Sequence, residues 1–219
     1  HIIVDEVYTD NRRPLDWQPQ DAYNLYHLQE ARLIMGSPYQ IESTEVEHLS
    51  QEQLPRIMNQ LLRTEAARLL IPPEDAETTL RIYDPDGGID ARMNNGITIR
   101  MDVGTAISRW MPAGVSIWQF KATAVLNKAN IYEELQKQEV KAAINEGATY
   151  CLVVSGGMTP IKQRNLRSRL QEAMTSLYPD SSCKLFLAEG IAEWASNHPI
   201  MALSFHHPVE SIIPLQWLI

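Results

Sequence analysis

The chain has 219 residues, of which 44% are hydrophobic and 21% are charged, values that are ordinary for a globular protein. That length accommodates one large domain or two small ones. The formal net charge of −8 excludes a protein that coats nucleic acid through its bulk charge, but it leaves room for a local basic surface. No segment approaches the ~20 consecutive apolar residues of a membrane-spanning helix, and the polar, acidic start is not typical of a signal peptide. We therefore expect no membrane partner.

The cysteines and the chain ends set two further expectations. Cys151 and Cys183 lie in apolar, strand-like runs, so we expect buried thiols of a cytoplasmic protein rather than a disulfide or metal ligands. The chain starts at His1 and ends on an apolar segment, which we interpret as a part of a longer protein. We expect an N-terminal extension packed on the core (1–45), a folded domain (46–205) and a tail that leads to further domains (206–219).

Hydrophobic periodicity predicts a helix followed by strands. Apolar residues at helical spacing indicate a helix that begins near Ser50 and ends at the Ile71-Pro72-Pro73 step. Short runs of strand-forming residues, separated by turn residues, then predict strands at 78–83, 89–93 and 115–122, with 97–101 extending a hairpin.

The second half of the chain alternates helices and strands. The pattern predicts a long amphipathic helix over 130–145, a strand over 150–154, a helix over 159–177, a strand over 185–188 and a helix over 190–196. This order predicts an α/β sandwich in which helices flank both faces of a central mixed sheet.

Asp90 follows Gly87 and Gly88 at the start of a predicted strand. A carboxylate there is costly unless it is solvated, paired or bound to a cation. The two glycines would leave room for a phosphate beside the strand. The alternative interpretation is that Asp84, Asp86 and Asp90 serve only as turn residues.

The strand at 115–122 carries a second polar group. Because side chains alternate along a strand, Gln119 and Lys121 share one face, and Trp118 and Phe120 share the other. A lysine on a buried-looking strand needs a partner, which Asp90 on the neighbouring strand would supply. The alternative is an edge strand with a solvated lysine. We predict that Asp90, Gln119 and Lys121 form a catalytic group.

Such a group would bind Mg²⁺ or Mn²⁺ and act on phosphodiesters. Asp90 would hold the cation, with the Phe120 carbonyl and the Gln119 side chain completing the oxygen ligands. Lys121 would orient or deprotonate the attacking water, or offset charge on the phosphorus, and the residues leave these roles open.

The motifs Gly-Gly-Ile-Asp-Ala (87–91) and Trp-Gln-Phe-Lys-Ala (118–122) resemble the PD-(D/E)xK restriction-endonuclease-like superfamily, over about residues 51–188. The residues of the two motifs are most similar to those of Mrr-type and antiphage-defence nuclease domains, which carry Gln-x-Lys and precede an NTPase region. The resemblance implies an αβββαβ core, Mg²⁺-dependent cleavage of double-stranded DNA, a role in bacterial antiphage defence and a fused NTPase or sensor region.

One acidic residue of that pattern has no direct counterpart, because the usual Phe-Glu of the first helix is replaced by Gln53-Leu54-Pro55. Glu65 or Glu52 would take its place as a fourth catalytic group, unless both lie on a solvated helix face. Two other functions stay open: a catalytically weak module for DNA binding or assembly, and a nuclease of RNA or single strands. Because cutting both strands of a duplex needs two active sites, we expect a homodimer or a larger assembly.

A dense basic run stands out in the acidic chain. Lys162, Gln163, Arg164, Arg167 and Arg169 lie at the start of a predicted helix, where backbone amides already favour phosphate. We predict that this segment binds DNA. The alternative is an exposed helix face whose cations pair with acidic neighbours.

Overall fold

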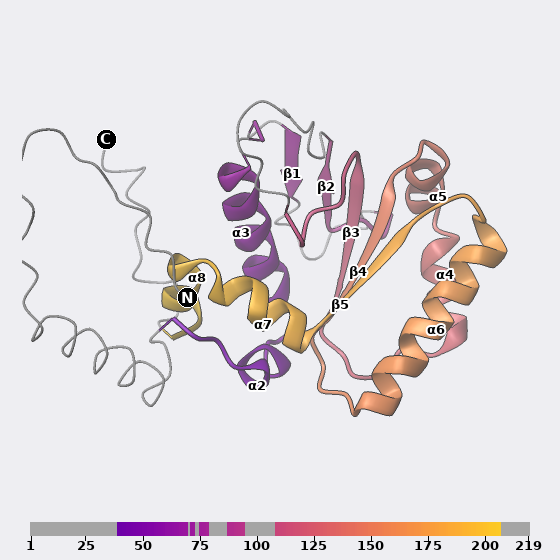
Figure 1. Ribbon diagram of the computed structural model, residues 1–219. Helices are drawn as coiled ribbons and strands as arrows, with labels where there is room; N and C mark the ends of the chain where they lie inside the picture. The colour runs from indigo at the N-terminus through magenta and orange to yellow at the C-terminus, as the bar shows by residue number, and fades with distance from the viewer. Residues whose placement is uncertain (1–38, 70, 73–74, 79–86, 95–107, 207–219) are drawn as a thin grey trace, which may run out of the picture. The chain divides into compact units, whose positions relative to one another are not determined.

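The computed structural model describes residues 39–69, 71–72, 75–78, 87–94 and 108–206. Within these ranges the chain forms a central sheet with helices on both faces, as Figure 1 shows. The α/β architecture with a mixed sheet, predicted from the order of elements, is confirmed.

The sheet has five strands in the described ranges, in the spatial order β1-β2-β3-β4-β5. The first three run antiparallel to one another, whereas β3, β4 and β5 run parallel. β3 is therefore the central strand, paired on both edges. The strands are β1 (Ala76–Thr78), β2 (Ala91–Met93), β3 (Ser116–Lys121), β4 (Thr149–Val154) and β5 (Cys183–Leu187).

One face of the sheet carries an aromatic core. Trp118 of β3 stacks on Phe186 of β5, with ring centroids 5.2 Å apart, and Trp194 lies 6.0 Å from Trp118. The helices packed around this core are α3 (Gln53–Arg68), α7 (Ala188–Ser196) and α8 (Pro199–His206), with the short α2 (Ser43–Glu47) against α7.

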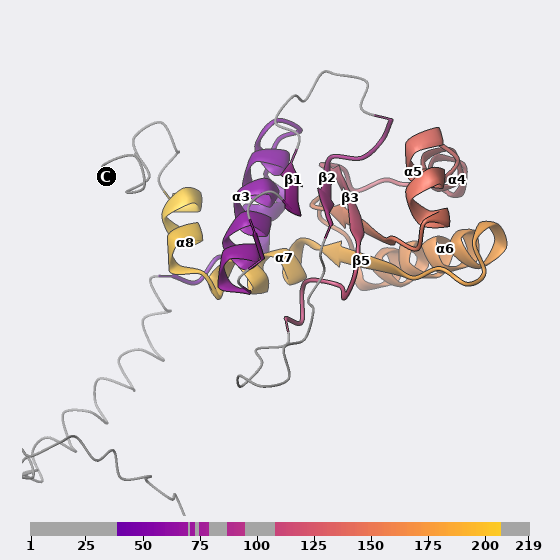
Figure 2. The ribbon, with the colours of Figure 1, turned by 90° about the horizontal axis from the view of Figure 1, so that it is seen from above.

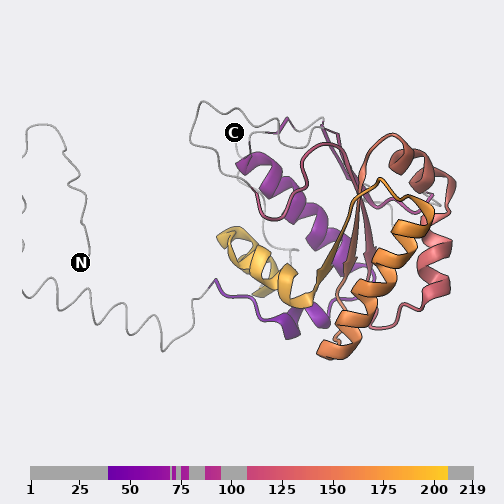
Figure 3. The same cartoon turned by 45° about the vertical axis from the view of Figure 1, so that its right-hand side comes forward.

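The other face carries an aliphatic core. Ile117 of β3 and Leu152 of β4 pack there against α4 (Lys128–Leu135), α5 (Gln138–Asn145) and α6 (Pro160–Leu177). Seen from above in Figure 2, and from the side in Figure 3, the two helical layers lie on opposite sides of the strands. Neighbouring residues of β3 thus project into separate cores, as strand alternation requires.

The prediction of one long helix over 130–145 is wrong, because the chain forms two helices, α4 and α5, with a corner between them. Lys137 adopts an extended backbone conformation, with φ −56° and ψ 139°, which ends one helix and precedes the next. In one continuous helix, Ile131 and Leu135 would lie on roughly the opposite side from Val140 and Ile144 at ~100° per residue. The corner brings both apolar pairs into the same core.

Other element bounds shift by a few residues. β1 shares only Thr78 with the strand predicted over 78–83, and 79–83 lie outside the described residues, as does the predicted strand 97–101. The predicted N-terminal extension lies outside them as far as residue 38, and the predicted tail does so from residue 207. Ile41, which falls within the predicted extension, is buried in the aromatic core.

Both cysteines are free thiols, and Cys151 is buried as predicted, whereas Cys183 is only half-buried. In the part of the chain that the structure describes, no helix is both long and apolar enough to cross a bilayer.

Candidate functional site

β3 presents Gln119 and Lys121 on the face that carries the aliphatic core. Trp118 and Phe120 pack into the opposite, aromatic core, so the predicted alternation is confirmed. Gln119 is buried, whereas 27% of the Lys121 side chain is exposed at the end of the strand. The strand therefore carries its amide inside the protein and its ammonium at the rim.

Asp90 lies just before β2 and is bonded to β3 twice. Its backbone amide donates to the Trp118 carbonyl at 2.8 Å, and its Oδ2 accepts from the Phe120 amide at 2.6 Å. This places Asp90 beside Gln119, since the ladder pairs Ala91 with Trp118. The contact with Phe120 is made by the amide of that residue, whereas the predicted metal ligand is its carbonyl.

Glu134 of α4 is the carboxylate that sequence reasoning missed. Its Oε1 accepts from Lys121 Nζ at 2.8 Å, and its Oε2 accepts from Lys137 Nζ at 2.6 Å and from the Gln119 side-chain amide. Burial alone would raise the pKa of Glu134, but hydrogen bonds from Lys121, Lys137 and Gln119 lower it. The partner predicted for Lys121 was Asp90, but the ion pair that the structure shows is with Glu134.

A signal for Glu134 exists in the sequence. At ~100° per residue, Glu134 lies beside the apolar stripe of Ile131 and Leu135, whereas Glu133 points to the far side of the helix. A carboxylate at the edge of a buried stripe needs a partner, and Lys121 ends the preceding strand. The helix was predicted without that pairing.

Tyr150 of β4 fixes the orientation of the Gln119 amide. The Tyr150 hydroxyl donates to Gln119 Oε1, while Gln119 Nε2 donates to Glu134. Burial raises the pKa of Tyr150, and the negative charges of Glu134 and Asp90 raise it further. Tyr150, Gln119 and Glu134 thus form one chain of hydrogen bonds, and Asp90 lies beside Gln119 in the ladder.

The two glycines before Asp90 do not leave open space, so the predicted room for a phosphate is wrong. Gly87 and Gly88 have φ of 65° and 89°, which favour glycine. A Cβ on Gly88 would lie 2.5 Å from Lys137 Cδ, and one on Gly87 would lie 2.3 Å from Glu139 Cγ. The glycines let this loop dock on the corner between α4 and α5.

The structure does not bring Glu65 into this group. Glu65 lies on α3, which packs against the aromatic face, and its side chain is only 1% exposed. Its carboxylate accepts from Arg68, Ser108, Trp194 and His198. The prediction of Glu65 as a fourth catalytic group is corrected, because its position on the apolar stripe of α3 buries it behind the sheet.

Glu52, the alternative acid, is exposed at the start of the same helix, α3. Neither acid on α3 therefore shares the sheet face that carries Gln119 and Lys121.

The donor set at the end of β3 consists of oxygen atoms, which suits Mg²⁺, a cation often held by one or two carboxylates. In the described ranges no group of three or more His, Cys, Asp or Glu side chains is arranged to hold a metal. Asp90 and Glu134 carry two negative charges, and Lys121 and Lys137 supply two positive ones. The donor chemistry therefore fits a divalent cation if Glu134 gives up an ammonium partner.

The predicted DNA-binding residues all lie on α6 but not on one surface. At ~100° per residue, Lys162 and Arg169 project within ~20° of each other, whereas Arg167 projects ~140° from Lys162. Lys162 and Arg169 line a hollow of about 280 Å³ against the loop after β3. Gln163 donates to the Met158 carbonyl and to Glu189, so it is engaged within the protein.

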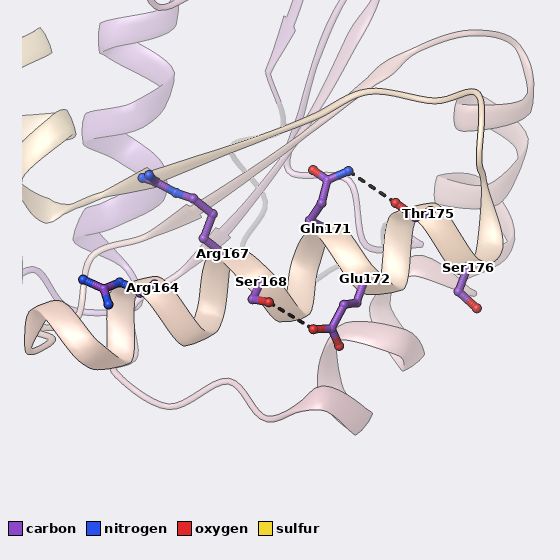
Figure 4. A pocket seen from close by; sticks show the side chains of 7 residues that line it. All are labelled: Arg164, Arg167, Ser168, Gln171, Glu172, Thr175 and Ser176. Atoms are coloured by element: carbon purple, nitrogen blue, oxygen red, sulfur yellow. Dashed lines mark hydrogen bonds between the residues drawn. The ribbon is translucent and has the colours of Figure 1, made fainter.

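Arg164 and Arg167 lie on a second stripe of α6. Figure 4 shows them projecting from the helix beside a shallow hollow, followed by the hydrogen-bonded pairs Ser168–Glu172 and Gln171–Thr175. The basic run is therefore split between two sides of the helix.

Comparisons of this chain with protein-family models, with curated proteins and with solved structures returned no match.

Proposed function

We propose that this chain is a divalent-metal-dependent endonuclease domain that cleaves double-stranded DNA, with its active site at Asp90, Gln119, Lys121 and Glu134. The observation that supports it most is the position of Lys121. Its ammonium lies at the end of the central strand, 2.8 Å from the Glu134 carboxylate, and Asp90 is bonded to the amide of the preceding residue, Phe120. This combination of oxygen donors and a lysine suits phosphodiester hydrolysis.

The architecture is compatible with a restriction-endonuclease-like αβββαβ core. α3, the antiparallel strands β1 to β3, the α4–α5 layer and the parallel β4 follow in that order. The place of the domain in antiphage defence, its fusion to an NTPase or sensor region and its assembly into dimers are proposals that rest on the resemblance of the two motifs.

Each residue of the proposed active site would have its own role in catalysis. Asp90 is held on β3 by two hydrogen bonds, so its second carboxylate oxygen keeps a fixed position. Lys121 would face the scissile phosphate and offset the charge that grows on it. Gln119, oriented by Tyr150, keeps Glu134 in place. A bound Mg²⁺ would polarise the phosphate.

The test is a plasmid-nicking assay with the purified chain in Mg²⁺, in Mn²⁺ and in EDTA, alongside Lys121→Met. Lys128→Met is the matched control, since Lys128 is exposed on α4 and pairs with Glu172 on the surface. Nicking that EDTA and Lys121→Met abolish, and Lys128→Met leaves intact, supports the proposal. Absence of nicking in both cations contradicts it.

One observation favours a second candidate, a DNA-binding or assembly module without catalysis. Both oxygens of Glu134 already accept from ammonium groups, those of Lys121 and Lys137, so this carboxylate is satisfied without a cation. Such a module would bind duplex DNA in a gel-shift assay and leave it uncut in Mn²⁺, whereas the nuclease would cut it.

A further inference from the structure

The corner between α4 and α5 places a second lysine, Lys137, at the site. The proposed active site assigns no role to this residue. Lys137 lies at the corner itself, where the backbone is extended. Its ammonium is 2.6 Å from Glu134 Oε2, and its stem packs against Gly88, two residues before Asp90. Lys137 therefore joins the loop that carries Asp90 to the helix that carries Glu134.

Glu134 is held by three side-chain donors. Its side chain is 18% exposed. It accepts hydrogen bonds from two charged donors, Lys121 and Lys137, and from one neutral donor, the Gln119 amide. Hydrogen bonds to an ionised carboxylate stabilise the charged form. Glu134 is therefore held as an anion, as a ligand of a hard cation must be.

The charges around Glu134 show what a cation would displace. Two ammonium groups, those of Lys121 and Lys137, now pair with its carboxylate at 2.8 and 2.6 Å. A divalent cation bound to the Glu134 carboxylate would replace those two positive charges, and it would release both lysines to face a phosphate. Without that exchange the cation would meet two positive charges, which disfavours its binding.

We propose that Glu134 is the second cation-binding carboxylate of the site, and that Lys121 and Lys137 compete with the cation for it. This inference rests on the proposed function, since it names a ligand and a competitor in the same site. It predicts opposite effects of two substitutions: removal of the Lys137 ammonium tightens cation binding, whereas removal of the Glu134 carboxylate weakens it.

The experiment is isothermal titration of Mn²⁺ into the DNA-free chain at neutral pH, with Glu134→Gln and Lys137→Met. Glu134→Gln is expected to weaken binding by about tenfold or more, and Lys137→Met to tighten it several-fold. The matched controls, Glu133→Gln on α4 and Lys141→Met on α5, remove the same charges from exposed positions and are expected to leave the affinity unchanged. Wild-type affinity in Glu134→Gln, or weaker binding in Lys137→Met, overturns the inference.

Two further arms keep the result interpretable. If Glu134→Gln proves poorly folded, Lys137→Met decides alone, because a loss of structure cannot tighten binding. Asp90→Asn separates the two proposals: loss of Mn²⁺ in Asp90→Asn but not in Glu134→Gln refutes the role of Glu134 and leaves the nuclease standing. Mn²⁺ binding that follows Glu134 and Lys137, with no nicking, supports this inference and refutes the nuclease, and a wild-type chain that binds no Mn²⁺ refutes the inference.

Discussion

Lys137 lies against Gly88, so closely that a Cβ at residue 88 would come within 2.5 Å of Lys137 Cδ. The contact couples the loop before Asp90 to the corner between α4 and α5. It gives the Gly-Gly pair a structural purpose that is separate from substrate binding.

Gly88→Ala is therefore expected to destabilise the fold by about 1–3 kcal/mol and to lower nicking, because the alanine would combine strain at φ 89° with displacement of Lys137. Gly147→Ala is the matched control, since Gly147 has φ 92° and no heavy atom within 4 Å of its added Cβ. Urea denaturation and the nicking assay would measure both. Equal losses in the two variants would show that the contact with Lys137 contributes nothing.

Asp90→Asn tests the hydrogen bond to β3. The carboxylate accepts from the Phe120 amide at 2.6 Å, and a neutral amide oxygen is a weaker acceptor. We expect a loss of about 1–2 kcal/mol in the free energy of unfolding, together with complete loss of nicking. Asp180→Asn, at an exposed position, is expected to change neither. Full nicking activity in Asp90→Asn would remove Asp90 from the active site.

Glu65 predicts a pH dependence of stability. Burial by itself would raise its pKa, but hydrogen bonds from Arg68, Ser108 and His198 lower it from 4.5 to about 2. Because the folded-state pKa lies below the unfolded one, Glu65 contributes about 3 kcal/mol above pH ~4.5, and this contribution is lost as the pH falls towards 2.

Denaturation at several pH values would measure this effect. Glu65→Gln is expected to be less stable at neutral pH and to show a flatter decline in acid. Glu193→Gln, which removes an exposed carboxylate paired with Arg109, serves as the control. An unchanged acid profile in Glu65→Gln would contradict the assignment.

The split of the basic run on α6 predicts unequal effects on DNA binding. Lys162 and Arg169 line the hollow against the loop that follows Lys121, whereas Arg164 and Arg167 lie on the other stripe. Lys162→Glu with Arg169→Glu is therefore expected to weaken binding more, and to lower the slope of log affinity against log salt by about 2.

Arg164→Glu with Arg167→Glu changes the same amount of charge on the same helix and is the matched comparison. Fluorescence anisotropy over a salt series would compare the two double variants. A larger loss in the second would move the DNA-binding surface to the exposed stripe of Figure 4.

The sequence predicted what depends on short-range periodicity. Gln119 and Lys121 share a face because strand alternation is local, and their separation from Trp118 is confirmed. Periodicity places Glu134 at the edge of the apolar stripe of α4, but its pairing with Lys121 depends on where α4 lands on the sheet.

The corner at Lys137 was missed for a different reason. Ile131 and Leu135 fit one helical phase, and Val140 and Ile144 fit another, but each pair alone is compatible with a helix. Only the requirement that both enter one core demands the break. Glu65 was misplaced because a glutamate on a helix is usually solvated or functional, whereas here four donors stabilise it in the interior.

The central position of β3 in the sheet affects how fast its amide protons exchange with solvent. Its backbone is hydrogen-bonded to a neighbouring strand on each edge, so its amide protons are expected to exchange with solvent only when the whole domain unfolds. The amides of Gln136 and Lys137 are bonded instead to carbonyls of the last turn of α4, so they are expected to exchange through local opening of that turn. Lys121 thus extends from the strand that is expected to open last, whereas Lys137, which pairs with the same carboxylate, lies where local opening is expected.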